Sequence, residues 1–131
     1  MLTTEQRKQG HYEMWMWCGR NPEKRKSDWP GLSYFGIEDD GMDSVCFACE
    51  EAIELKKHTR SNIHVCDHCP IDWGKVNNNP NGKCMTQNAL YDMWLSYAFE
   101  ISHNHNIPEE QIQKILFKRS IIAFIIANKW R

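Results

Sequence analysis

The sequence predicts a small α-rich domain with a zinc-knuckle or zinc-ribbon-like insert and little regular sheet. Apolar residues recur with helical spacing near both ends of the chain, and two C-x-x-C pairs stand between them. The 131 residues, of which 41% are hydrophobic and 25% charged, suit one globular domain. We therefore expect a single domain over 1–131, with N-terminal helices over 1–30, a zinc-binding region over 46–84 and a C-terminal helix pair over 86–130.

The first helix is expected to begin at Thr3, because a glutamine three residues later completes a capping box. Tyr12, Trp15 and Met16 form an apolar stripe along it, and Gly19 is expected to end it.

The middle of the chain predicts shorter elements. Asn21-Pro22 starts a brief helical turn that ends at Trp29-Pro30-Gly31, and 31–45 reads as irregular. Helix formers over 49–58 predict a short helix, and 62–65 reads as a strand or extended turn. The asparagine-rich stretch over 70–83 predicts a loop.

Two longer helices are predicted towards the C-terminus. Thr86 is a suitable cap for the first, whose apolar stripe consists of Leu90, Met93, Trp94, Tyr97, Ala98 and Ile101. Pro108 starts the second, which is apolar on all sides beyond Ser120. Since a small domain has little material to surround a helix, we expect a homodimer that buries part of this helix.

Cys46, Cys49, Cys66 and Cys69 have the spacing of a tetrahedral four-thiolate site. Zinc is the expected metal, in a structural role, because four thiolates suit its closed sites. An iron–sulfur cluster also uses such sulfurs, but nothing in the sequence indicates electron transfer. Cys18 lies on an apolar helical turn and is expected to be a core residue.

The tryptophans are expected to serve packing. Trp15 and Trp94 fall on helical apolar stripes and predict core positions. Trp29 and Trp73 each follow an aspartate in a loop, and we expect them to pin those loops to the metal region.

The order of these motifs resembles a family of small cysteine-rich, zinc-binding proteins encoded by bacteriophages and prophages of Gram-positive bacteria. The resemblance runs from about Trp15 to the end of the sequence. It implies a phage origin, a zinc-type site and residence in the host cytoplasm, and it implies no particular reaction. Its anchors are Asn21-Pro22, Asp28-Trp29-Pro30, Cys46-Phe47-Ala48-Cys49-Glu50, Cys69-Pro70, Asp72-Trp73-Gly74 and Cys84.

The family pattern includes Cys84, which leaves three ligand sets open. The first is the four paired cysteines. The second joins Cys46 and Cys49 to Cys84 and to either Cys66 or Cys69. The third includes a histidine, drawn from His58, His64 and His68.

The function we expect is that of a non-enzymatic accessory protein that binds zinc and modulates a host protein in defence or transcription. A nucleic-acid-binding zinc module is the alternative, using the basic C-terminal helix with Lys24, Arg25 and Lys26, although a net charge of -1 argues against it. A nuclease of the His–Asn–His type comes third. Its weak indications are Asp67-His68 and the asparagines at 77–79. A second histidine at suitable spacing is missing, because His103 and His105 fall at a predicted helix end, where we expect exposed imidazoles near the helix carbonyls.

Membrane insertion is not expected. The longest apolar run, over 121–127, is far shorter than the roughly 20 residues of a spanning helix. The first residues lack the apolar core of a signal peptide. Six cysteines in a reducing cytoplasm remain thiols that are available to a metal.

Overall fold

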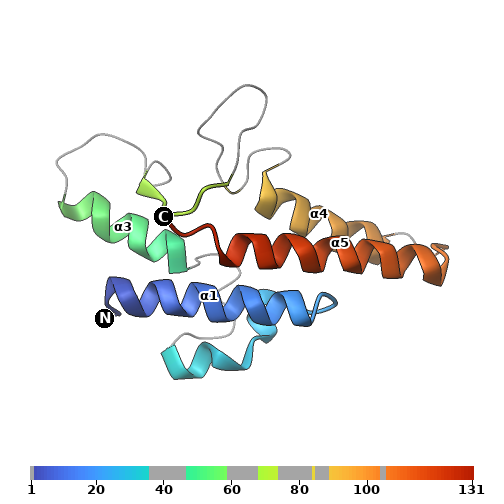
Figure 1. Cartoon of the computed structure of the whole chain (residues 1–131), viewed down its shortest axis with the longest axis horizontal. Helices are drawn as coiled ribbons and strands as arrows, with labels where there is room; N and C mark the ends of the chain where they lie inside the picture. Colours follow the sequence, from blue (N-terminus) through green and yellow to red (C-terminus); the bar gives the residue numbers. More distant parts are fainter. Residues whose placement is uncertain (1, 36–46, 59–67, 74–83, 85–88, 104–105) are drawn as a thin grey trace.

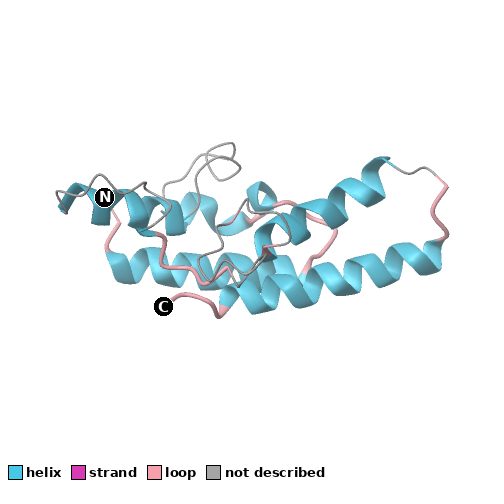
Figure 2. Cartoon of the chain, turned by 90° about the horizontal axis from the view of Figure 1, so that it is seen from above, coloured by secondary structure: helices cyan, strands magenta, loops and turns pink. Residues whose placement is uncertain are grey.

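The computed structural model describes residues 2–35, 47–58, 68–73, 84, 89–103 and 106–131. Its described elements, in chain order, are α1 (Thr4–Arg20), the 3-10 helices η1 (Lys26–Asp28) and η2 (Pro30–Phe35), α3 (Phe47–His58), α4 (Leu90–His103) and α5 (Glu109–Ala127). The described part of the chain contains no strand (Figure 2), and its one isolated β-bridge joins Ile71 to Trp130. The prediction of an α-rich domain is therefore confirmed, whereas a zinc-ribbon-like insert stays a prediction.

The helices pack around α1 and α5, which come from opposite ends of the chain and lie side by side (Figure 1). α4 packs on α5, and α3 packs on α1. None of the described helices is long and apolar enough to cross a membrane.

The start of α1 follows the sequence prediction. The Gln6 amide N–H donates to Thr3 Oγ1 at 3.1 Å, and the Thr3 amide N–H donates to Gln6 Oε1 at 2.8 Å, which together form the predicted capping box. At the other end, the helix continues through Gly19 to Arg20. The prediction that Gly19 ends the helix is wrong, because this glycine instead gives the Phe124 ring of α5 room to approach.

The buried face of α1 differs from the predicted stripe. Trp15 is buried, but Tyr12 is 42% exposed and Met16 is only half-buried. The residues that face the interior are instead Arg7, Gly10, His11, Met14, Trp15, Cys18 and Gly19. Four of these are polar or lack a side chain, so a search for apolar periodicity rotates the face away from its true position.

Aromatic residues fill the centre of the molecule. The Trp15 and Trp94 rings meet edge to face, with their centroids 5.0 Å apart, and both residues are buried as predicted. Tyr91 stacks on Trp94 at 6.0 Å. Trp29 packs edge to face on Phe47 at 6.1 Å, which holds the η1–η2 segment against the first turn of α3.

The predicted helix over 49–58 is confirmed as α3, and it begins two residues earlier, at Phe47. Its outer face carries Ile53 and Leu55, while its inner face contacts α1 through an ion pair. Glu51 Oε2 lies 2.6 Å from Arg7 Nη1, and both side chains are buried. The expected strand over 62–65, the loop over 74–83 and the Thr86 cap lie outside the described residues.

α5 is enclosed on one side only. Pro108 occupies its N-cap position, and Ile115, Ile122 and Ile126 are buried against the rest of the domain. Its outer side bears an exposed apolar stripe that consists of Phe117 (68% exposed), Ile121 (43%) and Ile125 (39%). The predicted homodimer, in which a second copy covers this stripe, stays a prediction.

Candidate metal and cavity site

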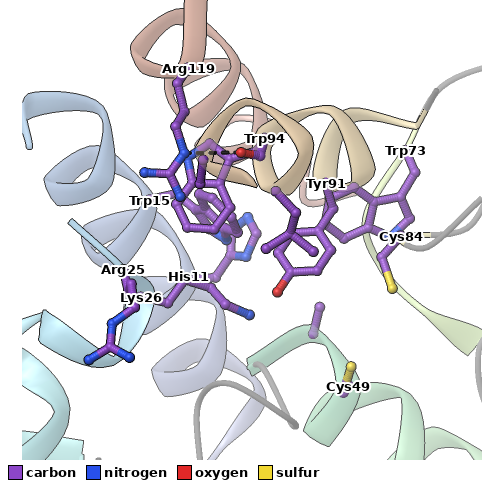
Figure 3. Close-up of a pocket in the computed structure, with 13 residues that line it drawn as sticks. His11, Trp15, Arg25, Lys26, Cys49, Trp73, Cys84, Tyr91, Trp94 and Arg119 are labelled. Carbon is purple, nitrogen blue, oxygen red and sulfur yellow. Dashed lines mark hydrogen bonds between the residues drawn. The ribbon is translucent and has the colours of Figure 1, made fainter. Parts of the chain in front are cut away.

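A cavity of about 480 Å³ lies where α1, η1, α3 and α4 converge (Figure 3). Aromatic rings, basic side chains and two thiols line it. The lining includes Lys26, Cys49, Trp73, Cys84, Tyr91 and Arg119. A partly open, mostly apolar hollow with a few polar groups has the character of a binding or metal site.

Two of the predicted metal ligands open into this cavity. Cys49 lies in the first turn of α3, and Cys84 is half-buried and packs against the core cluster. Figure 3 shows both sulfur atoms turned toward the space between α3 and Tyr91. The structure thus brings Cys49 and Cys84 to one cavity, as the second ligand set requires.

The remaining cysteines of the predicted site are only partly described. Cys69 is half-buried against the core cluster, and Cys46 and Cys66 lie outside the described residues. The described residues alone do not contain a group of three or more His, Cys, Asp or Glu side chains that could hold a metal ion. A complete site therefore needs at least one ligand from the rest of the chain.

His68, in the C-D-H-C segment, offers a nitrogen that fits a metal ligand. Its Nε2 atom is buried and makes no hydrogen bond to any residue that the structure describes. A buried imidazole nitrogen normally has a hydrogen-bond partner or a metal. Of the other two histidines of the third ligand set, His58 is exposed at the end of α3 and His64 lies outside the described residues.

Cys18 is a core residue, as predicted. It is fully buried between α1 and its neighbours. Burial raises the pKa of its thiol to about 12, although the nearby positive charges of Arg119 and Lys26 act in the opposite direction. A thiol with this pKa stays protonated at neutral pH, in keeping with a core residue.

Trp73 and Trp29 both bury their rings, as expected for residues that pin loops. Trp73 packs on Tyr91 with the ring centroids 5.9 Å apart, and it forms part of the cavity wall. Trp29 instead joins η2 to α3 through Phe35 and Phe47, on another side of the molecule. Of the two, Trp73 is therefore the one placed beside the candidate metal ligands.

Arg119 is a buried cation whose guanidinium group donates hydrogen bonds to backbone carbonyl oxygens. Its Nε donates to the Trp94 carbonyl at 3.0 Å, and its Nη1 donates to the carbonyls of Lys24 (3.0 Å) and Pro22. Its guanidinium carbon also lies 3.8 Å from the centroid of the Trp94 ring. Burial lowers the pKa of Arg119 from its ordinary value. The side chain thus ties α5 to α4 and to the segment before η1.

Lys26 and Arg119 change the assessment of a nucleic-acid-binding function. Both belong to the basic residues that would contact phosphates in that function, yet only 5% and 3% of their surfaces are exposed. Arg25 remains exposed but pairs with Asp28, at 3.5 Å. A surface that contacts nucleic acid needs accessible cations, so these burials remove two of its contacts.

His11 is the least expected member of the cavity wall. Its Nε2 donates to the Ile126 carbonyl at 2.9 Å, which links α1 to the end of α5. Burial lowers its pKa to about 4, with the hydrogen bond to Ile126 acting weakly in the other direction. The imidazole is therefore neutral at pH 7.

Of the residues named for a His–Asn–His nuclease, the structure describes His68 and His103. His103 stacks on Phe99 at the exposed end of α4, and its Nδ1 lies 3.1 Å from the Phe99 carbonyl. This matches the expectation of a histidine near the helix-end carbonyls. Asp67, the asparagines at 77–79 and His105 lie outside the described residues.

Sequence reasoning missed Lys26, His11 and Arg119 as interior residues. Charged and polar side chains normally lie at the surface, so composition alone gave no reason to place them inside. Comparisons of the chain with protein-family models, with curated proteins and with solved structures give no match.

Proposed function

We propose that this chain is a non-enzymatic, phage-encoded accessory protein that holds one structural zinc ion and binds a protein of its host. The observation that carries the zinc site is the convergence of Cys49 and Cys84 on one cavity. Cys46 stands one C-x-x-C spacing before Cys49, which suits the same metal. Cys66, Cys69 and His68 are the candidates for the fourth ligand.

The proposed role of the metal is to fasten the cysteine-bearing segments to the helices. Bound zinc supplies a closed four-ligand cross-link and no reaction. Cys49 lies in the first turn of α3, whereas Cys69 and Cys84 belong to later segments that join α3 to α4. A metal held by these residues connects separate segments of the chain, and its binding free energy contributes to folding.

The zinc content of the purified protein tests this proposal. We expect one zinc per chain, and a lower melting temperature after a strong chelator removes it. Cys49→Ser is expected to abolish binding, and Cys84→Ser separates the second ligand set from the first. Cys18→Ala is the matched control and is expected to keep the metal. A protein without zinc, whose melting temperature the chelator leaves unchanged, contradicts the proposal.

A protein partner is favoured over nucleic acid because of what the surface offers. The exposed apolar stripe of α5 (Phe117, Ile121 and Ile125) suits contact with another protein, while Lys26 and Arg119 are buried. Capture of one discrete host protein, lost in Ile121→Glu, supports the proposal. Binding to DNA that weakens steeply with added salt supports the nucleic-acid module instead.

A further inference from the structure

Two buried cations lie against aromatic rings in the wall of the cavity. Lys26 Nζ lies 4.5 Å from the centroid of the Tyr91 ring, and the Arg119 guanidinium carbon lies 3.8 Å from the centroid of the Trp94 ring. The Tyr91 and Trp94 rings stack on each other, with their planes at 18°. A stacked pair of rings, with a cation against each ring, therefore forms part of the cavity lining (Figure 3).

The charged side chains among the described lining residues are all basic. They are Arg25, Lys26 and Arg119, and this described lining contains no aspartate or glutamate. Arg25 has Asp28 as a partner at 3.5 Å, whereas the hydrogen bonds of Arg119 go to uncharged carbonyls. A hollow whose charged groups have one sign attracts ligands of the opposite sign. The lining thus favours an anionic ligand.

One hydrogen-bond donor of the lining lacks an acceptor. The Trp94 Nε1 atom is buried and makes no hydrogen bond to any residue that the structure describes. A buried indole N–H normally has an acceptor. A ligand that carries acceptor oxygens is therefore favoured over a purely apolar one.

The walls also indicate the shape of the ligand. Tryptophan and tyrosine rings line the cavity at Trp15, Trp73, Tyr91 and Trp94, and flat aromatic molecules pack well on such rings. The volume of about 480 Å³ is within the usual range for small-molecule sites. Apart from Tyr91, the described lining residues carry no hydroxyl group, and none of them carries a side-chain amide. The sugar and the base of a nucleotide therefore leave hydrogen bonds unmade here.

We propose that the cavity binds a small aromatic carboxylate. The rings of this ligand pack on the aromatic walls, and its negative charge is matched by Lys26 and Arg119. The site is additional to the proposed zinc site and does not depend on it. The side chains that recognise the ligand belong to η1, α4 and α5, whereas the two thiols of the lining belong to α3 and to Cys84.

Calorimetric titration of the purified wild type tests the class of ligand with three probes. Naphthoate and naphthylmethanol share their ring system and differ in charge, and we expect naphthoate to bind about tenfold tighter or more, because hydrogen bonds to a charged group are stronger. Adenosine monophosphate, an anion with a sugar and a more polar ring, is expected to bind at least about tenfold more weakly than naphthoate.

Nuclear magnetic resonance locates the bound naphthoate without any substitution. The indole N–H signals of Trp73 and Trp94 are expected to shift when naphthoate is added, because both rings line the cavity. The signal of Trp17 is the internal control, since this residue lines a separate groove between α1 and η2. It is expected to stay in place.

Four variants test the residues of the site. Ala98→Phe fills the cavity and is expected to abolish the binding of naphthoate and of naphthylmethanol. Lys26→Met is expected to reduce the preference for naphthoate about tenfold, and Lys26→Arg is expected to keep it. Ile121→Ser, on the exposed apolar stripe of α5, is the control for binding elsewhere and is expected to match the wild type.

The wild type alone is able to overturn the proposal. Absence of naphthoate binding, equal affinities for naphthoate and naphthylmethanol, or tighter binding of adenosine monophosphate each rule out an aromatic carboxylate. A shift at Trp17 without one at Trp73 and Trp94, or loss of binding in Ile121→Ser, places the probe outside the cavity and also overturns it. If Ala98→Phe or Lys26→Met does not fold, the wild-type titrations and the indole signals decide.

Discussion

The helices α1, α4 and α5 form a helical frame, and it differs from the cysteine side, which consists of α3, residues 68–73 and Cys84. The frame buries Trp15, Trp94 and Ile126 in one continuous core. The same core also contains Phe47, Ala48, Ile71 and Trp73 of the cysteine side, whose described cysteines are only half-buried. The frame therefore supplies most of the core, and the cysteine side joins it through a smaller set of side chains.

The attachments of the cysteine side to the frame are of three kinds. The Phe47 ring packs on α1 where Gly10 leaves space for it. The Arg7–Glu51 ion pair joins α1 to α3. The segment after Cys69 pairs with the end of the chain, where the Asp72 amide N–H donates to the Lys129 carbonyl at 3.1 Å. Loss of any one is expected to loosen the cysteine side before the frame unfolds.

The largest loss of stability is expected for a substitution within the frame itself. Trp15→Ala removes the ring that meets Trp94 and Tyr91, and it is expected to destabilise the protein by about 3–5 kcal/mol. Denaturant unfolding followed by circular dichroism measures the loss. Tyr34→Ala, at a side chain that is 86% exposed, is the control and is expected to change stability by less than about 0.5 kcal/mol. Equal effects of the two substitutions mean that the frame is not the stable region.

Breaking the ion pair tests the attachment of the cysteine side. Arg7→Met leaves Glu51 buried with only the Thr4 hydroxyl, which donates to Glu51 Oε1 at 2.9 Å. We expect a loss of about 3 kcal/mol, because a buried charge then lacks its partner. The double variant Arg7→Met with Glu51→Met is expected to recover much of that loss. If hydrogen exchange rises in α5 as much as in α3, the two regions unfold as one unit.

Acid is expected to weaken the frame through His11. Its folded pKa of about 4 lies below its ordinary value of 6.5, so the unfolded chain binds the proton more readily between these values. The stability that is present above pH 6.5 is therefore lost as the pH falls towards 4. Between pH 7 and pH 5 we expect His11 to contribute a loss of about 2 kcal/mol.

Melting curves against pH test this expectation, in the wild type and in His11→Gln. The variant is expected to show the smaller loss, because glutamine does not titrate. His103→Gln, at an exposed histidine, is expected to follow the wild type. Subtraction of the curves cancels the loss of metal at low pH, which all three proteins share. Parallel curves for the wild type and His11→Gln contradict the assignment.

The smallest change in stability is expected for a substitution on the outer side of α5. Ile121→Ser shortens the exposed apolar stripe and is expected to change the stability of a single chain by less than about 0.5 kcal/mol. Its effect on assembly is expected to be larger. If the stripe forms the predicted homodimer, light scattering shows a dimer for the wild type and a monomer for the variant. A wild type that stays monomeric at every concentration rules this dimer out.

Much of the fold follows from local sequence signals, and these signals fail where distant segments meet. The capping box at Thr3, the start of α5 after Pro108 and the burial of Trp94 each depend on neighbouring residues and were predicted correctly. The orientation of α1 depends on Phe47 and Phe124, which pack against glycines far away in the sequence. Periodicity contains no information about such partners.

The candidate site, like the fold, was predicted where local sequence decides and missed where distant segments meet. The C-x-x-C spacing predicted Cys49 as a ligand together with Cys66 and Cys69, and it gave no reason to bring Cys84 to the same cavity as Cys49. The burial of Lys26 was unpredictable, because a lysine becomes an interior residue only when a particular tertiary partner compensates for it.

The pairing of α1 with α5 also has a consequence for the order in which the protein folds during synthesis. The His11–Ile126 hydrogen bond joins residues 115 positions apart, so α1 leaves the ribosome long before its main partner exists. Until then, α4 is the one part of the frame that is able to contact Trp15, and the surface that α5 covers stays open. Helical proteins that fold fastest are dominated by local contacts. We therefore expect this one to fold more slowly than its helix content suggests, and to need protection from aggregation until α5 has been synthesised.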